Sequence, residues 1–177
     1  MEYRDYLASA MQLLAADPRV IFLGQSLNHR GNAMSKTLER ISLDRRIELP
    51  LIEDTQIGMS IGLSLQGYVP ISIYPRFDFL ILATNQLANQ LDKLEALSSG
   101  AFKPKVIIRT AVGSKSPINA GLQHTQNYSE AFRIMLNNID ILELKDSSQI
   151  MPVYQDALIS NRSKIIVEFY SLYNQQE

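Results

Sequence analysis

The sequence contains no cysteine among its 177 residues. This absence excludes a disulfide framework, a thiolate nucleophile and any metal site built on cysteine ligands. Apolar runs are also short, well below the roughly 18 residues of a membrane helix. Charged Glu2, Arg4 and Asp5 precede the first of these runs, unlike in a secretory signal peptide. We therefore expect a cytoplasmic protein with no membrane partner.

An excess of charge of one sign is missing too. Seventeen Lys and Arg residues balance eighteen Asp and Glu residues, which leaves a net charge of −1, and neither sign forms a long run. Nucleic acid is therefore not an expected partner. The length, with 46% hydrophobic residues, is enough for one substantial core, so residues 1–177 are expected to form a single domain.

Apolar runs alternate with amphipathic segments along the chain. Residues 2–16 repeat apolar side chains at helical spacing up to Asp17-Pro18, where proline ends the helix. Residues 25–36 are rich in turn formers and predict a loop. Further helices are expected at 79–96 and 147–160, and strands at 20–24, 70–74, 105–109, 139–144 and 165–170. The alternation predicts an α/β fold, a three-layer sandwich with a mostly parallel sheet.

The stretch from Pro50 to Gly62 places one carboxylate, Glu53, between an apolar strand end and a helix that contains glycines. Ligands bind at this edge of an open α/β sheet, and a carboxyl group beside apolar neighbours such as Ile52 can share a proton with a ligand nitrogen. On these residues alone a solvated glutamate is the more frequent case, because acidic residues are favoured in the first turn of a helix.

The order of residues around Glu53 resembles a known signature. Glu53 is followed after four residues by Gly58-Met59-Ser60-Ile61-Gly62, as in the pyrimidine-binding domain of thiamine diphosphate enzymes. The stretch is similar to the N-terminal domain of the beta subunit of the 2-oxoacid dehydrogenase decarboxylating component, where Pro-Leu-x-Glu leads into a glycine-rich helix. The resemblance implies a thiamine diphosphate-binding fold of transketolase type. It also implies that Glu53 shares a proton with the aminopyrimidine and so promotes loss of the thiazolium proton.

Two aromatic residues follow the strand at 70–74. Most aromatics there belong to the core, but a flat heteroaromatic ligand also needs such a face. The run from Gly67 to Ile71 resembles the same family, which places an aromatic against the aminopyrimidine. Counting from Glu53 assigns this role to Phe79, with Phe77 as the fallback, and the resemblance makes Ile52 a further cofactor contact.

A second catalytic candidate lies in the loop that follows the strand at 105–109. The run from Gly121 to Gln126 resembles the family's His-Ser-Gln loop, with Thr125 in place of the serine. The resemblance implies that His124 acts on a reaction intermediate. In the earlier loop, His29 and Arg30 could contact an anion, although an exposed basic loop is the favoured interpretation because no phosphate-binding glycine pattern surrounds them.

The family's other half-site is absent from the sequence. Thiamine diphosphate and its cation are held elsewhere in the family by a Gly-Asp-Gly segment, and this chain has no Gly-Asp dipeptide and no cluster of metal ligands. The resemblance therefore implies a stand-alone pyrimidine-binding domain without the C-terminal transketolase domain. Its partner would be an alpha-type subunit that holds the diphosphate and magnesium. We expect an alpha2beta2 heterotetramer, packed through Gly58 and Gly62.

Three functions remain open at this stage. The first is a thiamine diphosphate-dependent subunit, of decarboxylase or carboligase type, that acts on a 2-oxo acid and transfers or releases the acyl or aldehyde unit. The second is ketol transfer, as in a split transketolase. The third is a catalytically idle subunit that stabilises its partner, which the presence of Glu53 disfavours.

Overall fold

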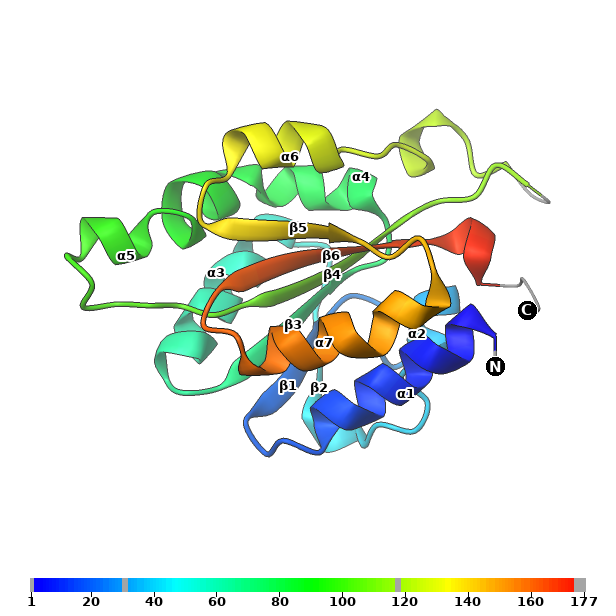
Figure 1. Ribbon diagram of the computed structural model, residues 1–177, viewed down its shortest axis with the longest axis horizontal. Helices are drawn as coiled ribbons and strands as arrows, with labels where there is room; N and C mark the ends of the chain where they lie inside the picture. The colour runs from blue at the N-terminus through cyan, green and yellow to red at the C-terminus, as the bar shows by residue number, and fades with distance from the viewer. Residues whose placement is uncertain (1, 30–31, 117–118, 174–177) are drawn as a thin grey trace.

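The computed structural model describes residues 2–29, 32–116 and 119–173. Its centre is a six-stranded sheet in the order β2-β1-β3-β4-β6-β5, in which every neighbouring pair is parallel (Figure 1). The strands are β1 (Val20–Gly24), β2 (Arg46–Glu48), β3 (Val69–Tyr74), β4 (Ile107–Val112), β5 (Ile139–Glu143) and β6 (Ser163–Phe169).

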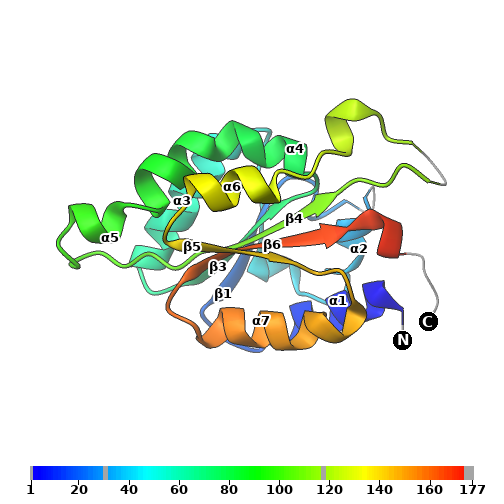
Figure 2. The same cartoon turned by 45° about the horizontal axis from the view of Figure 1, so that its top comes forward.

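Helices cover both faces of this sheet, as Figure 2 shows. On one face, α1 (Tyr3–Ala15) packs against α7 (Ile150–Ile159), and the short α2 (Ala33–Lys36) joins the same buried cluster. On the other face lie α3 (Glu53–Leu65), α4 (Phe77–Leu80), α5 (Leu94–Leu97) and α6 (Ser129–Met135). The predicted three-layer α/β sandwich with a parallel sheet is thus confirmed.

Apolar periodicity explains how the two outer layers form. Leu7, Met11 and Leu14 recur at helical spacing on α1 and are fully buried, while Ile57 and Ile61 do the same on α3. The central strands between them are buried on both faces, as parallel strands covered on both sides are. Each face of the sheet therefore carries its own hydrophobic core.

The prediction of one continuous helix at 79–96 is wrong. The segment begins two residues earlier with α4, continues as the 3-10 turn η2 (Ile81–Ala83), and widens into the π-helix η3 (Gln86–Leu91) before α5. The Asp92 backbone N–H bonds the carbonyl of Leu87 at 2.9 Å, and the buried Asp92 carboxylate accepts the N–H groups of Asn137 and Asn138 at 2.9 and 2.7 Å. The wider turn thus places the Asp92 carboxylate where it accepts hydrogen bonds from the backbone between α6 and β5.

Other boundaries also differ from the predictions. The loop predicted at 25–36 contains α2, whose capping residue Asn32 accepts the N–H of Ser35 at 2.7 Å. The strand β4 begins at Ile107 rather than at residue 105, and α6 was not predicted. Short 3-10 turns complete the described chain: η1 (Leu43–Arg45), η4 (Leu122–His124), η5 (Ser147–Gln149) and η6 (Tyr170–Leu172).

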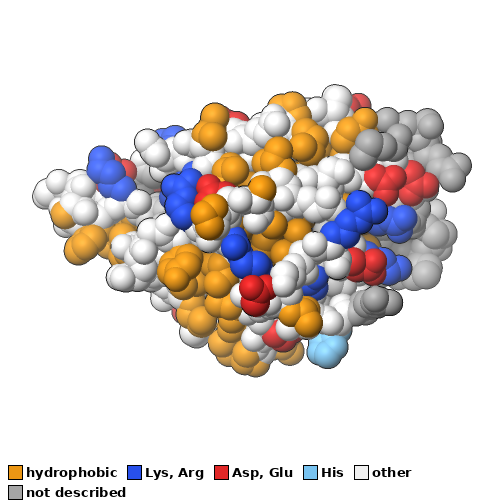
Figure 3. Space-filling view, turned by 90° about the horizontal axis from the view of Figure 1, so that it is seen from below, with side chains coloured by type: hydrophobic (Ala, Val, Ile, Leu, Met, Phe, Trp, Pro, Cys, Tyr) orange, Lys and Arg blue, Asp and Glu red, His pale blue; other side chains and the backbone are white. Residues whose placement is uncertain are grey.

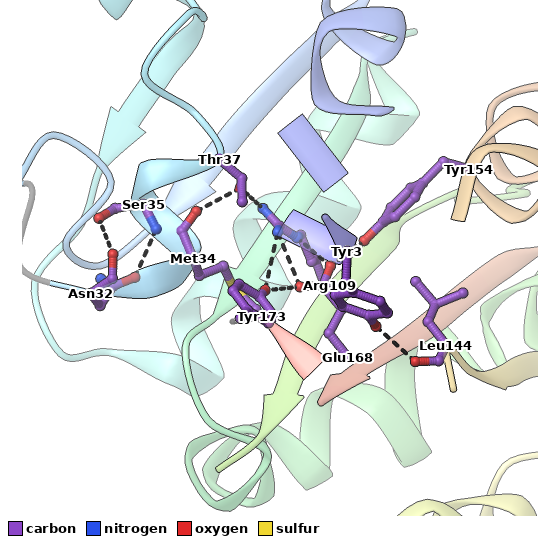
Figure 4. Close-up of polar contacts among 10 residues, drawn as sticks. All are labelled: Tyr3, Asn32, Met34, Ser35, Thr37, Arg109, Leu144, Tyr154, Glu168 and Tyr173. Carbon is purple, nitrogen blue, oxygen red and sulfur yellow. Dashed lines mark hydrogen bonds and ion pairs between the residues drawn. The ribbon is translucent and has the colours of Figure 1, made fainter. Parts of the chain in front are cut away.

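A fully buried ion pair joins two neighbouring central strands (Figure 4). Arg109 of β4 donates from Nε and Nη2 to the two carboxylate oxygens of Glu168 on β6, at 2.6 and 3.0 Å. Tyr154 donates to Glu168 at 2.6 Å, and Tyr173 donates to the other oxygen of the same carboxylate. The Arg109 Nη1 group donates to Thr37 at 2.8 Å. Because each charge has partners, the network holds α7, the end of α2 and the C-terminal turn on the sheet.

The surface agrees with the charge balance of the sequence. On the face that Figure 3 shows, basic side chains lie next to acidic ones and no large patch has a single sign. Within the described residues, no helix is long and apolar enough to cross a membrane.

Candidate active site

The carboxyl ends of the parallel strands meet at one edge of the sheet, to which β5 and β6 point at the right of Figure 1. Glu53 is the first residue of α3, which follows β2. Phe79 lies in α4, which follows β3, and His124 lies in the loop that follows β4. Strands β3 and β4 are direct neighbours, and β1 lies between them and β2. The structure therefore gathers the predicted site residues at the edge where α/β proteins bind ligands.

Glu53 is half-buried at the first position of α3. Its backbone carbonyl accepts the hydroxyl of Tyr74, the last residue of β3, at 2.9 Å. Burial raises the pKa of this hydroxyl above its usual range, so Tyr74 stays a proton donor to the carbonyl. Within the described residues, the Glu53 carboxylate itself has no hydrogen bond and no ion pair. It is therefore held in place through its backbone while its oxygens remain available to a ligand.

A buried amide fixes the first turn of α3 against the sheet. Gln56 donates from Nε2 to the Ser72 hydroxyl and to the Ile73 carbonyl, both at 3.0 Å. At Gly24, where β1 ends with a φ of +154°, a Cβ atom would lie 2.4 Å from the same carbonyl oxygen. Only glycine allows this approach. The sequence pattern did not reveal Gln56 as a supporting residue, because polar residues near helix starts are common.

Phe79 and His124 are brought into direct contact. Their ring centroids lie 5.6 Å apart with an interplanar angle of 84°, an edge-to-face arrangement. The pair forms the wall between two adjacent pockets. One, of about 230 Å³, is also lined by Gln25, Ser26, Asn32, Pro75 and Arg76. The other, of about 450 Å³, is also lined by Asp78, Leu82, Leu122, Gln123, Gln126 and Tyr128.

A glycine makes room for the histidine loop. A Cβ atom at Gly113, just beyond β4, would lie 1.9 Å from the backbone carbonyl oxygen of His124 and 3.4 Å from Arg76 Nε. The loop is closed on itself by Thr125, whose hydroxyl donates to the Gly121 carbonyl at 3.1 Å. The close backbone contact at Gly113 therefore sets the position of His124 relative to Phe79.

The other predicted residues lie in different surroundings. Phe77 is fully buried, and its ring packs 5.2 Å from that of Phe132 and 5.7 Å from that of Tyr128. Phe77 is therefore a core residue, and of the two predicted aromatics only Phe79 lines the pockets. Ile52 is 36% exposed beside Glu53. Neither Ile52 nor Glu53 lines either pocket.

Two further predictions concern residues that line neither of these two pockets. His29 lines a separate pocket with Arg46, and Arg30 lies outside the described residues. At Gly62 a Cβ atom would meet nothing within 4 Å, and at Gly58 the nearest atom would be Gln86 Oε1 at 3.7 Å. The two glycines therefore do not serve close helix packing within this chain, and their role toward a partner stays a prediction.

These donors fit one half of a thiamine diphosphate site. An available carboxylate, a neighbouring apolar residue and an exposed aromatic edge suit a flat, nitrogen-containing ring. Among the described residues, no group of three or more His, Asp or Glu side chains is placed to hold a metal ion. The donor set thus matches the aminopyrimidine end of the cofactor rather than its diphosphate and cation.

Known proteins similar to this chain include subunits of pyruvate dehydrogenase. No model of a protein family matches the chain. Among curated proteins, the pyruvate dehydrogenase E1 component subunit beta of Chaetosphaeridium globosum is 28% identical over 177 residues, covering 98% of this chain and 52% of that protein. The corresponding subunit of Gracilaria tenuistipitata var. liui is 29% identical over 161 residues, covering 89% of this chain and 49% of that protein. The chain thus spans about half the length of these relatives.

The fold has a counterpart among solved structures. A split-gene transketolase, described as an inactive beta4 tetramer, superposes with a TM-score of 0.70 at 17% identity, over 99% of this chain and 51% of that one. The likeness confirms the transketolase-like fold of the pyrimidine-binding domain. Over nearly its whole length the chain is therefore similar to part of the E1 beta subunits of pyruvate dehydrogenase, as the signature around Glu53 predicts.

Proposed function

We propose that this chain is the pyrimidine-binding subunit of a split thiamine diphosphate enzyme that decarboxylates a 2-oxo acid and then transfers or releases the acyl or aldehyde unit. The observation that carries the proposal is the state of Glu53. Its backbone is fixed by Tyr74 at the carboxyl edge of a parallel sheet, while its carboxylate has no partner within the described residues. The similarity to E1 beta subunits supports the same conclusion.

Each site residue then has one task. Thiamine diphosphate, when bound, supplies the electron sink for cleavage of the bond next to the substrate carbonyl. Glu53 holds a proton at a ring nitrogen of the aminopyrimidine, with Ile52 beside it limiting access of water. Phe79 offers the ring an aromatic contact. His124, in edge-to-face contact with Phe79, is a proton donor for the final release or transfer step.

We further propose that the second half of the site comes from a partner. We propose an alpha-type subunit with a Gly-Asp-Gly motif that holds the diphosphate and magnesium, in an alpha2beta2 assembly. The support is twofold: the sequence has no Gly-Asp dipeptide, and the described residues contain no metal-ligand cluster.

Calorimetry of cofactor binding tests this division. The chain alone, with thiamine diphosphate and magnesium, should show no tight binding, whereas the chain with its partner should bind. Micromolar binding by a demonstrated monomer of this chain would contradict the split site. A partner whose complex with this chain binds no cofactor would favour an idle, stabilising subunit instead.

Ketol transfer is the alternative reaction, and it needs the same residues up to attack on the carbonyl. The two are separated by supplying the assembled enzyme with 2-oxo acids or with ketose phosphates and analysing the products. Release of CO₂ supports decarboxylation, while a two-carbon transfer without CO₂ supports the transketolase alternative.

A further inference from the structure

Arg76 is a cation at the pocket wall that the proposed chemistry leaves unused. It lies two residues after the end of β3 and lines the 230 Å³ pocket together with Phe79 and His124. Its Nε atom is buried and has no hydrogen-bond partner among the described residues. Within the described residues its guanidinium forms no ion pair, although Asp78 is only two positions away and lines the neighbouring pocket.

The guanidinium is nevertheless held in a fixed position. Its central carbon lies 4.2 Å from the centroid of the Tyr170 ring, which is a cation–π contact, and Nη1 donates to the Pro75 carbonyl at 2.9 Å. An arginine has five N–H donors in a rigid fork, and only one of them is used here. A fixed cation with most of its donors free is suited to binding a carboxylate or a phosphate group.

The rest of the pocket supplies neutral polar groups. Gln25 is 8% exposed, and its side-chain amide makes no hydrogen bond within the described residues. Asn32 also lines this pocket and is fixed as the cap of α2, which Thr37 in turn ties to the buried Arg109 (Figure 4). Asp78 lines the other pocket and not this one. The pocket with Arg76 is therefore lined by no carboxylate among the described residues, which favours an anionic ligand.

We propose that Arg76 forms a subsite for a second, non-reacting carboxylate or phosphate group of the substrate, an inference that rests on the proposed function for the identity of that substrate. The group bound by Arg76 is not the carboxylate that leaves as CO₂, because an arginine holding that group would stabilise the ground state against decarboxylation. The substrate class is thus a 2-oxo acid, or a carbonyl acceptor, that carries an additional anionic group.

The first test uses the chain by itself. Its two histidines give a simple NMR spectrum, so the His124 ring reports directly on the pocket. Titration with malonate, and separately with inorganic phosphate, at constant ionic strength should move the His124 signals in a saturable way. Arg76→Gln should weaken this binding about tenfold to a hundredfold, as loss of a charged hydrogen-bond donor does.

Matched variants separate a specific site from a change of net charge. Arg162→Gln removes the same charge next to the amino end of β6, at the far edge of the sheet, and should bind both anions as the wild type does. Arg76→Lys keeps the charge without the fork and should fall between wild type and Arg76→Gln. No saturable shift in the wild type, or equal binding by Arg76→Gln, would overturn the proposal.

The second test uses the assembled enzyme and distinguishes the two anion sources. Two pairs of substrates are compared: 2-oxo acids with and without a second carboxylate, and carbonyl acceptors with and without a phosphate. In one of these pairs, Arg76→Gln should lower kcat/KM more for the substrate that carries the additional anionic group. Equal losses in both pairs would overturn the subsite. Failure of the proposed function would look different: no substrate would be turned over, while the anion titration would still separate Arg76→Gln from the wild type.

Discussion

Replacing Gly113 by alanine tests how the fold positions His124. The added Cβ atom would lie 1.9 Å from the His124 carbonyl oxygen, and Cβ atoms essentially never approach within 3.0 Å of such an atom, so the two backbones must separate by about 1.1 Å. Both partners are backbone, which leaves no flexible side chain to absorb the shift. A displacement of about 1 Å in a catalytic group can cost about a hundredfold in rate. We expect Gly113→Ala to fold but to lose turnover by about that factor.

NMR and kinetics check this prediction together. The His124 ring signals should shift, because the ring leaves its edge-to-face contact with Phe79, while those of His29 stay in place. For the NMR measurement on the chain by itself, Gly62→Ala is the control for the loss of a glycine, since within this chain its Cβ would meet nothing within 4 Å and alanine favours the helix by up to about 1 kcal/mol. Unchanged His124 signals and full activity in Gly113→Ala would refute the proposed role of Gly113.

Three further predictions follow from the buried network and from the site. Glu168→Gln should lower the free energy of unfolding by about 3–5 kcal/mol in denaturant titrations, because it leaves Arg109 buried without its charge partner. Glu130→Gln, at an exposed ion pair, should change the free energy of unfolding by less than about 1 kcal/mol. Equal losses of stability in the two variants would contradict the value predicted for Glu168→Gln. Burial, with the charge of Glu168, raises the pKa values of Tyr154 and Tyr173 well above their usual range. Stability should therefore be full below about pH 10 and fall above it as the unfolded chain releases those protons. Tyrosinate absorbance that appears before unfolding would contradict this. Finally, His124→Gln should depress product release or transfer in the assembled enzyme while leaving proton loss from the cofactor nearly normal, and unchanged turnover would remove His124 from the mechanism.

The sequence predicted those parts of the fold that depend on local patterns. The strand at 20–24 has the predicted bounds, and Glu53 lies at a strand-to-helix junction as its apolar flanks indicated. These predictions succeed because an apolar run between proline and glycine has few alternatives in a parallel sheet. The loop with His124 also lies at the predicted edge.

Tertiary contacts account for the predictions that failed. The leucines from Leu80 to Leu91 keep helical spacing, but the buried Asp92 must reach the turn before β5, which widens the helix there. Phe77 and Phe79 look equivalent in sequence, and only the packing of α4 against α6 and its flanks buries the first. Arg109 and Glu168 are 59 residues apart, so their pairing depends on strand order.

The position of Arg76 at the ligand-binding edge can be predicted from the sequence. Arg76 is the first charged residue after β3, at the edge where ligands bind. The lack of an ion-pair partner among the described residues, however, is visible only once the surrounding strands and loops are in place.

The exchange of the thiazolium carbon proton in the assembled enzyme tests the central claim most directly. It is measured by deuterium incorporation into bound thiamine diphosphate after rapid quenching, in wild type and in Glu53→Gln, with Glu130→Gln as a surface control. The proposed function predicts that Glu53→Gln slows this exchange by about a hundredfold or more, the usual contribution of a positioned acid or base, while cofactor binding and the fold persist. An exchange rate equal to that of the wild type would contradict the assignment of Glu53 as the residue that activates the cofactor.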